Sequence, residues 1–195
     1  TNGPTATSVG PSFSYPPLSP PPRIIVAALD EKWNLVAQLV GDALANNDLD
    51  LQSWVRDEAD RRGTRGMTAL MLACSAGAWP AVRQLVRCGT NLDARNVYGE
   101  TALMLACKQG NVDIVILLLT KKIALDVQDS ERNRSALMYA VASTASSELV
   151  GLLLKHGANA TLRDAEDKDA FSIALESGCD IKVLDTLRGV AEKRE

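Results

Sequence analysis

The chain has 195 residues, of which 46% are hydrophobic and 23% are charged, and its formal net charge is −3. This length and apolar share are enough for one domain with a sizeable core. The slight negative charge argues against a general nucleic-acid binder, because such proteins need an excess of Lys and Arg to neutralise phosphates. The two longest apolar stretches, 24–29 and 114–119, are far shorter than the roughly 20 residues of a membrane-spanning helix, so we expect no membrane span.

The first segment in chain order, residues 1–22, is rich in proline, serine and threonine. It contains all but one of the eight prolines and has no helical periodicity. Segments of this composition bury too little apolar surface to offset the conformational entropy that folding removes. We therefore predict a disordered tail or linker at 1–22.

From Arg23 onward the sequence repeats itself. Residues 66–77 (GMTALMLACSAG) and 99–110 (GETALMLACKQG) are identical at nine of twelve positions, at an offset of 33. Weaker copies follow at 135–143 (SALMYAVAS) and 169–178 (DAFSIALESG), each a further 34 residues along. A fixed period of this length predicts a stack of repeated structural units.

Each copy predicts two short helices separated by a turn. In the second unit, Leu70, Ala73 and Cys74 have the i, i+3, i+4 spacing of one helix face. Gly77 is suited to end this helix, and Pro80 to the first turn of the next one. Because helices of about two turns are not stable alone, each pair must cover its apolar faces with a neighbouring pair.

The first unit departs from the period. Residues 27–40 align without gaps with 73–86, an offset of 46 instead of 33. Most of this surplus falls around Trp54 and Val55, in the turn that leads to the second unit. We predict that 51–62 project from the stack as an enlarged turn, a finger, whose apolar residues contact a partner. The alternative, in which Trp54 folds back onto the stack, stays open.

These repeated residues resemble the ankyrin-repeat family. The resemblance rests on Thr-Ala-Leu at 68–70 and at 101–103 and on KHGANA at 155–160. It implies an all-α repeat solenoid of about five stacked helix–turn–helix units at 23–190, with β-hairpin turns projecting at right angles to the helix pairs. The units are expected at about 23–62, 63–95, 96–128, 129–163 and 164–190, followed by a charged C-terminal tail at 191–195.

The chain differs from the family pattern at one repeated position. Met71, Met104 and Met138 stand where the family has histidine. We expect thioether packing there, without the hydrogen bonds that histidine makes. In the last unit Asp169 replaces threonine and Phe171 replaces leucine, as suits an end unit with one face in solvent.

The sequence carries no recognisable catalytic or metal-binding pattern. His156 is the only histidine, the four cysteines include no CxxC pair, and the glycines do not form a phosphate-binding loop. We therefore expect no enzyme activity, no metal or other cofactor, and no small-molecule substrate. Because so apolar a chain has little need of a disulfide framework, we expect a reducing location, cytoplasmic or nuclear.

The resemblance implies a protein–protein interaction module or scaffold, because members of this family mostly bind other proteins through turn tips and first helices. The partner would be another protein and not a nucleic acid. The turns carry charges of both signs, which argues against a broad surface for polyanions. The candidate contact residues lie on the tips, on the first helices and on the finger with its flank, 51–65. They are Trp54, Arg56, Arg65, Met67, Arg95, Tyr98, Glu100, Lys108, Gln109, Arg132 and Arg134.

Two alternatives stay open at this point. Tyr98 precedes a turn glycine and fits a structural brace as well as a partner contact. The whole chain also fits a regulatory ankyrin segment of a larger enzyme or channel, whose active part lies outside these residues.

Overall fold

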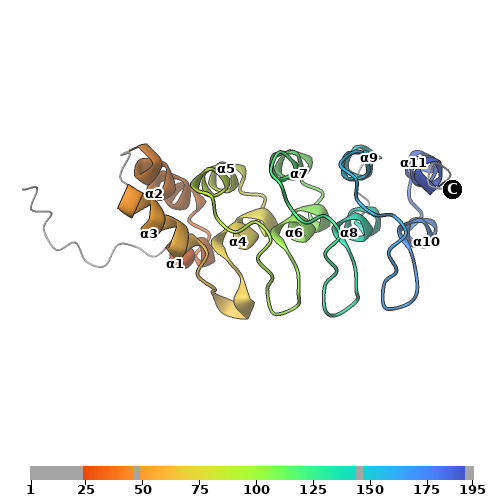
Figure 1. The fold of residues 1–195 in the computed structure, drawn as a ribbon, viewed down its shortest axis with the longest axis horizontal. Helices are drawn as coiled ribbons and strands as arrows, with labels where there is room; N and C mark the ends of the chain where they lie inside the picture. Colours follow the sequence, from red (N-terminus) through yellow and green to blue (C-terminus); the bar gives the residue numbers. More distant parts are fainter. Residues whose placement is uncertain (1–23, 46–48, 144–146, 192–195) are drawn as a thin grey trace, which may run out of the picture.

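The computed structural model describes residues 24–45, 49–143 and 147–191 (Figure 1). These ranges contain eleven α-helices and no β-strand beyond one isolated bridge. No helix within them is both long and apolar enough to cross a membrane. The predicted tail at 1–22 lies outside the described residues, as do residues 192–195 of the predicted C-terminal tail. Residue 191 ends the last helix instead.

Five helix pairs stand side by side in a row, with the first helices in one layer and the second helices in another (Figure 1). First helices pack against the first helices of the adjacent pairs, and second helices against second helices. The all-α repeat solenoid is thereby confirmed. The pairs are α1 (Ile24–Leu29) with α2 (Trp33–Ala45), α4 (Ala69–Ser75) with α5 (Trp79–Cys88), α6 (Ala102–Lys108) with α7 (Val112–Leu119), α8 (Ala136–Ala142) with α9 (Ser147–Lys155), and α10 (Ala170–Glu176) with α11 (Ile181–Ala191).

Two repeated features of the sequence explain this packing. The alanines at equivalent positions of the first helices are completely buried, and their small side chains let neighbouring pairs approach closely: Ala73, Ala106, Ala140 and Ala174. Leucines at equivalent positions of the second helices fill the other layer: Leu85, Leu118 and Leu153. The core is therefore continuous along the stack and is shared between units.

The first helices α4, α6, α8 and α10 begin at equivalent capping residues, Thr68, Thr101, Ser135 and Asp169. Each capping side chain accepts a hydrogen bond from the backbone N–H three residues later, which satisfies a donor that the helix itself leaves unpaired. The repeated sequence pattern therefore fixes where these helices start.

The methionines contribute to two of these caps. The sulfur of Met71 accepts a hydrogen bond from the backbone N–H of Thr68 at 3.5 Å, and that of Met104 accepts one from Thr101 at 3.4 Å. Thioether packing was expected here in place of the hydrogen bonds of histidine, but at these two positions the sulfur also accepts a hydrogen bond. A thioether sulfur one turn into the helix is a weak acceptor that still reaches the cap.

The loops that lead into the first helices project to one side of the stack (Figure 1). Equivalent residues of the four loops have positive φ: Gly66, Gly99, Asn133 and Asp167. In the first loop the preceding residue, Arg65, has positive φ as well. Glycine, asparagine and aspartate are the residues that adopt this conformation most readily. Among the described residues only Gln128 and Ser135 form a β-bridge, so the predicted β-hairpins are hairpin-shaped loops and not strand pairs.

Equivalent hydrogen bonds join each loop to the next. At the tips, a backbone N–H donates to a carbonyl of the preceding loop: Val97 to Arg65, Ser130 to Tyr98, and Ala165 to Arg132. At the base, an aspartate of one unit accepts from a backbone N–H of the next: Asp60 from Asn91, Asp93 from Ala124, and Asp126 from Asn159. The projecting loops are thus tied together along the stack.

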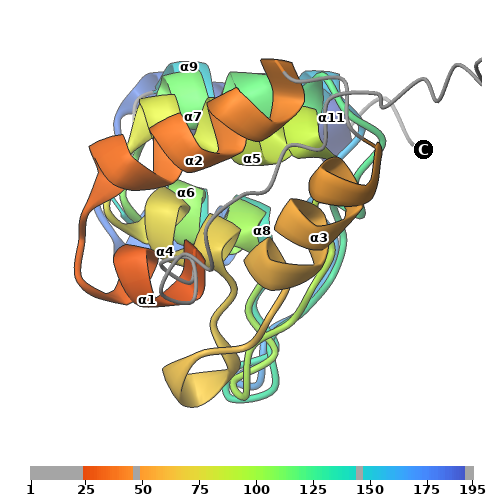
Figure 2. The same ribbon diagram turned by 90° about the vertical axis from the view of Figure 1, so that its left-hand side faces the viewer.

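The predicted finger was wrong. Leu49–Ala59 forms a helix, α3, that packs against α1, α2 and α5 (Figure 2). Val55 and Ala59, one helical turn apart, are buried, so they hold α3 to the stack and do not project from it. The 3₁₀ turn η1 (Thr64–Gly66) then forms the tip of the first loop. The period located the surplus residues, but a count of residues does not distinguish a loop from a docked helix.

Candidate protein-binding site

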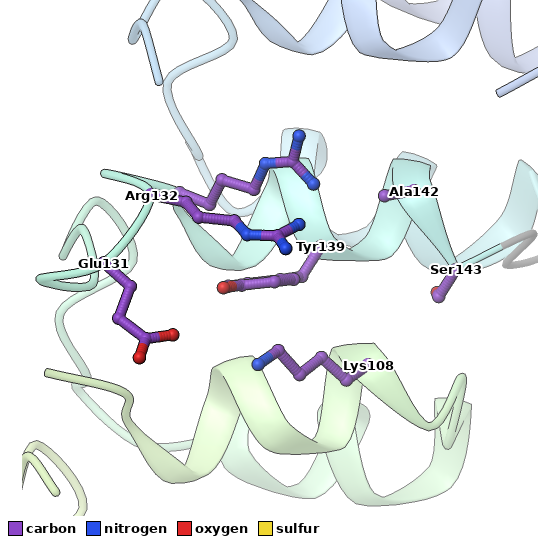
Figure 3. A pocket seen from close by; sticks show the side chains of 7 residues that line it. Lys108, Glu131, Arg132, Tyr139, Ala142 and Ser143 are labelled. Carbon is purple, nitrogen blue, oxygen red and sulfur yellow. The ribbon is translucent and has the colours of Figure 1, made fainter. Parts of the chain in front are cut away.

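A hollow of about 380 Å³ opens where α6, α8 and the loop before α8 meet (Figure 3). We call the side formed by the first helices and their preceding loops the inner face, and the side formed by the second helices the outer face. The hollow lies on the inner face, in the middle of the stack. Its lining residues are Lys108, Glu131, Arg132, Arg134, Tyr139, Ala142 and Ser143.

Tyr139 of α8 stands at the centre of the hollow. Its hydroxyl donates a hydrogen bond to Asp129 Oδ2 at 2.8 Å. Burial, together with this bond to an ionised carboxylate, raises the pKa of Tyr139 well above its ordinary value. The phenol therefore stays protonated and its ring is held in one orientation.

Asp129 holds the loop as well as the tyrosine. It is buried and accepts hydrogen bonds from the backbone N–H groups of Glu131, Arg132 and Arg134 at 2.7–3.2 Å. Burial alone would raise its pKa, but these bonds and the Tyr139 hydroxyl outweigh that effect and lower it. An ionised Asp129 thus fixes the loop that carries the two arginines.

Lys108, the last residue of α6, covers one face of the tyrosine ring. Its ammonium nitrogen lies 4.2 Å from the centroid of the Tyr139 ring and forms an ion pair with Glu100. Glu100 also accepts a hydrogen bond from Asn96 Nδ2 at 2.7 Å. Figure 3 shows Lys108 approaching from α6, with Arg132 on the opposite side of the ring. Such a cation–aromatic contact is favourable and orients the ammonium toward the hollow.

The two arginines of the loop differ in their pairing. Arg134 Nε forms an ion pair with Asp164 Oδ2 of the next loop at 3.2 Å. Asp164 is buried. Burial favours its neutral form, yet hydrogen bonds from Lys168, Glu166 and Arg134 lower its pKa. Arg132 and Glu131 are exposed at the rim, and neither side chain has an ion-pair partner among the described residues.

Comparison with known proteins identifies the fold. A family model of three ankyrin repeats matches residues 24–129, and a model of a single ankyrin repeat matches 132–165. The chain belongs to the ankyrin-repeat family. No curated protein matches it. Ankyrin repeats are generally protein–protein interaction modules and typically non-catalytic.

Four of the candidate contact residues converge in this part of the ankyrin stack. Lys108, Arg132 and Arg134 line the hollow, and Glu100 pairs with Lys108 beside it. Gln109 follows Lys108 as the exposed C-terminal cap of α6. The structure thus brings four of the predicted contact residues together, and their role as partner contacts stays a prediction.

The other candidates lie elsewhere on the ankyrin stack. Arg95 joins two loops, since its guanidinium donates to the carbonyls of Gly99 at 3.1 Å and Gln128 at 2.7 Å. Met67 is half-buried and its sulfur accepts from Asn96 Nδ2. Tyr98 is half-buried at a loop tip, whereas Arg65 at a tip and Arg56 on α3 are exposed. Trp54 belongs to α3, and its side chain is outside the described part. Their roles as contacts stay predictions.

Tyr139 and Glu131 were missed by sequence reasoning. Tyr139 occupies the position of Leu72 and Leu105 in the preceding ankyrin units, so a polar aromatic interrupts a leucine column. That interruption was the available signal. Its meaning depends on Asp129 and Lys108, which reach the ring from the loop and from another helix.

None of the four cysteines is among the described residues that line the hollow. Cys74 and Cys107 occupy equivalent first-helix positions and are completely buried, and burial raises the pKa of both thiols. Cys88 is half-buried beside α3, where burial also raises its pKa despite the nearby Arg56. Within the described ranges, no cluster of three or more His, Cys, Asp and Glu residues could hold a metal ion.

Proposed function

We propose that this ankyrin domain binds a partner protein across its inner face, with the hollow between α6 and α8 at the centre of the contact. The observation that supports this most is the convergence of Lys108, Arg132 and Tyr139, from two helices and a loop, on one concavity. A concave site with a few convergent polar groups is the usual form of a recognition site.

The surface positions of the inner face also differ in residue type from unit to unit, whereas a buried position beside them does not. At the C-terminal ends of the first helices, equivalent positions hold Ser75, Lys108, Ala142 and Glu176. The buried position two residues earlier is alanine in every one of these helices. A rigid frame that presents different side chains at regular intervals is suited to selecting one partner.

The proposal extends to a scaffold role in a reducing compartment, cytoplasmic or nuclear. Its support is the presence of Cys74 and Cys107 as buried thiols that pack against the stack. A binding scaffold needs no reacting group at its surface, and the rigid orientation of Tyr139 and the loop fits recognition.

The test compares two variants of the whole chain, each carrying two substitutions to glutamine. The inner-face variant is Ser75→Gln with Ala142→Gln, which extends side chains from the inner face at the helix ends. The matched outer-face variant is Arg83→Gln with Ile116→Gln, at equivalent exposed positions of α5 and α7. Circular dichroism melting curves verify that both variants are folded.

Each chain is immobilised and exposed to a lysate of the cells that produce the protein, and captured proteins are identified by mass spectrometry. We expect at least one protein to be retained by the wild type and the outer-face variant and lost by the inner-face variant. Capture that survives the inner-face changes but is lost with the outer-face changes would place the partner on α5 and α7 and overturn the proposal.

A further inference from the structure

We propose that the hollow between α6 and α8 receives an acidic side chain, Asp or Glu, from an extended segment of the partner protein. This inference rests on the proposed function and specifies the chemistry of the contact. Its basis is an imbalance between hydrogen-bond donors and acceptors at the rim of the hollow.

The donors of the hollow are not used up within the chain. The guanidinium of Arg132 has five N–H groups and no hydrogen-bond partner among the described residues. Arg134 uses Nε for Asp164, and its two terminal nitrogens have no partner in the same part of the chain. Lys108 donates to Glu100 and keeps further N–H bonds for solvent or a ligand. All three cations line the hollow.

The acceptors beneath them are already occupied. Asp129 accepts four hydrogen bonds, and Asp164 accepts bonds from two backbone N–H groups and from Arg134. The side chain of Asp164 is 1% exposed, and that of its partner Arg134 is 15% exposed. In the Glu100–Lys108 pair the carboxylate is 12% exposed and the ammonium side chain 34%. In both pairs the carboxylate is the more buried partner and the cation the more exposed one.

A carboxylate is the ligand that this arrangement fits. It accepts two parallel hydrogen bonds from a guanidinium, and charge-assisted bonds of this kind are stronger than neutral ones. The small side chains of Ala142 and Ser143 form one end of the hollow and leave room beside Tyr139 (Figure 3). A partner segment can therefore place an acidic side chain beside the Tyr139 ring, where Arg132 approaches from one side of the ring and Lys108 from the other.

Glu131 repels such a ligand, and its substitution tests whether the ligand is an anion or a cation. Its carboxylate is exposed at the rim and repels an incoming anion, whereas it would attract a cation. Glu131→Gln should therefore strengthen the binding of an acidic segment and weaken that of a basic one. Arg132→Ala should act in the opposite direction.

The experiment selects binders from a displayed library of random linear peptides, with the whole wild-type chain as the target. We expect the selected peptides to share an Asp or Glu at one position. One such peptide and its amide version, Asp to Asn or Glu to Gln, are then titrated by fluorescence anisotropy. The protein variants are Arg132→Ala, Glu131→Gln and the matched control Arg83→Ala, an exposed arginine on α5.

For the acidic peptide, Arg132→Ala should weaken binding by about tenfold or more, the usual effect of losing a hydrogen bond between charged groups. Glu131→Gln should strengthen its binding, and Arg83→Ala should leave it unchanged. The amide peptide should bind weakly and respond little to Arg132→Ala, since the coupled partner is gone.

The other outcomes separate this inference from the proposed function. Suppose that the selected peptides bind the wild type but not the inner-face variant, and share either no acidic residue or a basic or phosphorylated one. This result would overturn the inference of an acidic ligand and would still support binding at the inner face. Peptides that lose binding only to the outer-face variant overturn both. A library without any inner-face binder overturns the extended segment, while a folded protein captured through the inner face still supports the proposed function.

Discussion

The regular units in the middle of the stack and the inserted helix α3 reach stability in different ways. In the regular units, the contacts that join successive loops have counterparts one period away, such as the aspartate bonds of Asp93 to Ala124 and of Asp126 to Asn159. Helix α3 has no counterpart. Its Glu58 is buried with Oε1 unpaired, while Oε2 forms an ion pair with Arg61 at 3.1 Å. The same loop contact forms in several units of the stack, whereas the contacts of the inserted helix form only once.

The repeated contacts also tolerate substitution by residues of like chemistry. Asn96, Asp129 and Asp164 occupy equivalent loop positions, and each side chain accepts hydrogen bonds from backbone N–H groups of its own loop. Each loop thus needs a side-chain oxygen that accepts hydrogen bonds from its backbone N–H groups, and either an amide or a carboxylate oxygen can accept them. The comparison between period and insertion can be tested from its largest expected effect to its smallest.

The largest effect should come from the shared core. Leu118→Ala removes a completely buried side chain from α7 and should cost about 2–5 kcal/mol of unfolding free energy through the cavity it leaves. Ile116→Ala on the same helix, at a side chain that is 41% exposed, should cost less than about 1 kcal/mol. Urea unfolding measures both. Equal losses of unfolding free energy would show that the position of a residue within the repeat does not determine its contribution to stability.

A second test concerns the tie between successive loops. Gly99 and Gly89 share a φ of +78°, but a Cβ on Gly99 would lie 2.8 Å from the backbone nitrogen of Ser130, whereas nothing lies within 4 Å of one on Gly89. Gly89→Ala should cost about 1–2 kcal/mol from the backbone strain alone. Gly99→Ala should cost roughly 2–4 kcal/mol, because crowding against the next loop adds to the strain. Similar unfolding midpoints for the two variants would contradict the loop contact.

The third prediction concerns the insertion. Val55→Ala removes two buried carbons from the contact of α3 with the stack and should cost about 1–2 kcal/mol. Arg56→Ala, at the exposed neighbouring position, should stay within about half a kcal/mol of the wild type. Thermal unfolding of both variants tests whether α3 is a docked part of the fold. If Val55→Ala were as mild as Arg56→Ala, α3 would be an appendage.

The same comparison explains what the sequence could predict. Ala73, Ala106 and Ala140 recur because each is buried at the same position of the contact between adjacent helix pairs, so periodicity alone was enough to predict those pairs. The buried residues Val55 and Ala59 have no repeated equivalent. Their one-turn spacing is too short a signal to separate a helix from a loop.

The candidate site was predictable only in part for the same reason. The family pattern pointed to Lys108, Arg132 and Arg134, but not to their pairing. Arg134 meets Asp164 across 30 positions of sequence, and Lys108 meets Tyr139 from a neighbouring unit. Such pairings depend on how far adjacent units are rotated and spaced, which the sequence pattern leaves undetermined.

The smallest effect is expected from exchanging the two chemistries at the repeated loop position. Asp129→Asn keeps an oxygen for the N–H groups of Glu131 and Arg132, as Asn96 does for its own loop. It replaces the second oxygen, which accepts from Tyr139 and Arg134, by an amide NH2. This group can donate to the Tyr139 hydroxyl oxygen, but it leaves the backbone N–H of Arg134 without its acceptor. The expected loss at neutral pH is about 1 kcal/mol, the usual net value of one such hydrogen bond.

The pH dependence of that loss identifies the charge as its cause. Burial of Asp129 opposes ionisation, but its four hydrogen bonds outweigh burial, so its pKa in the folded chain lies below the ordinary value. The stabilisation is therefore fully present above the unfolded-state pKa of about 4 and disappears as the pH falls through the folded-state pKa. Urea midpoints of the wild type and Asp129→Asn should differ at neutral pH and converge in acid. The loss caused by Leu118→Ala involves no titrating group at that position and should persist in acid. A difference for Asp129→Asn that survives acid to the same extent would mean that shape, and not charge, is what the aspartate contributes.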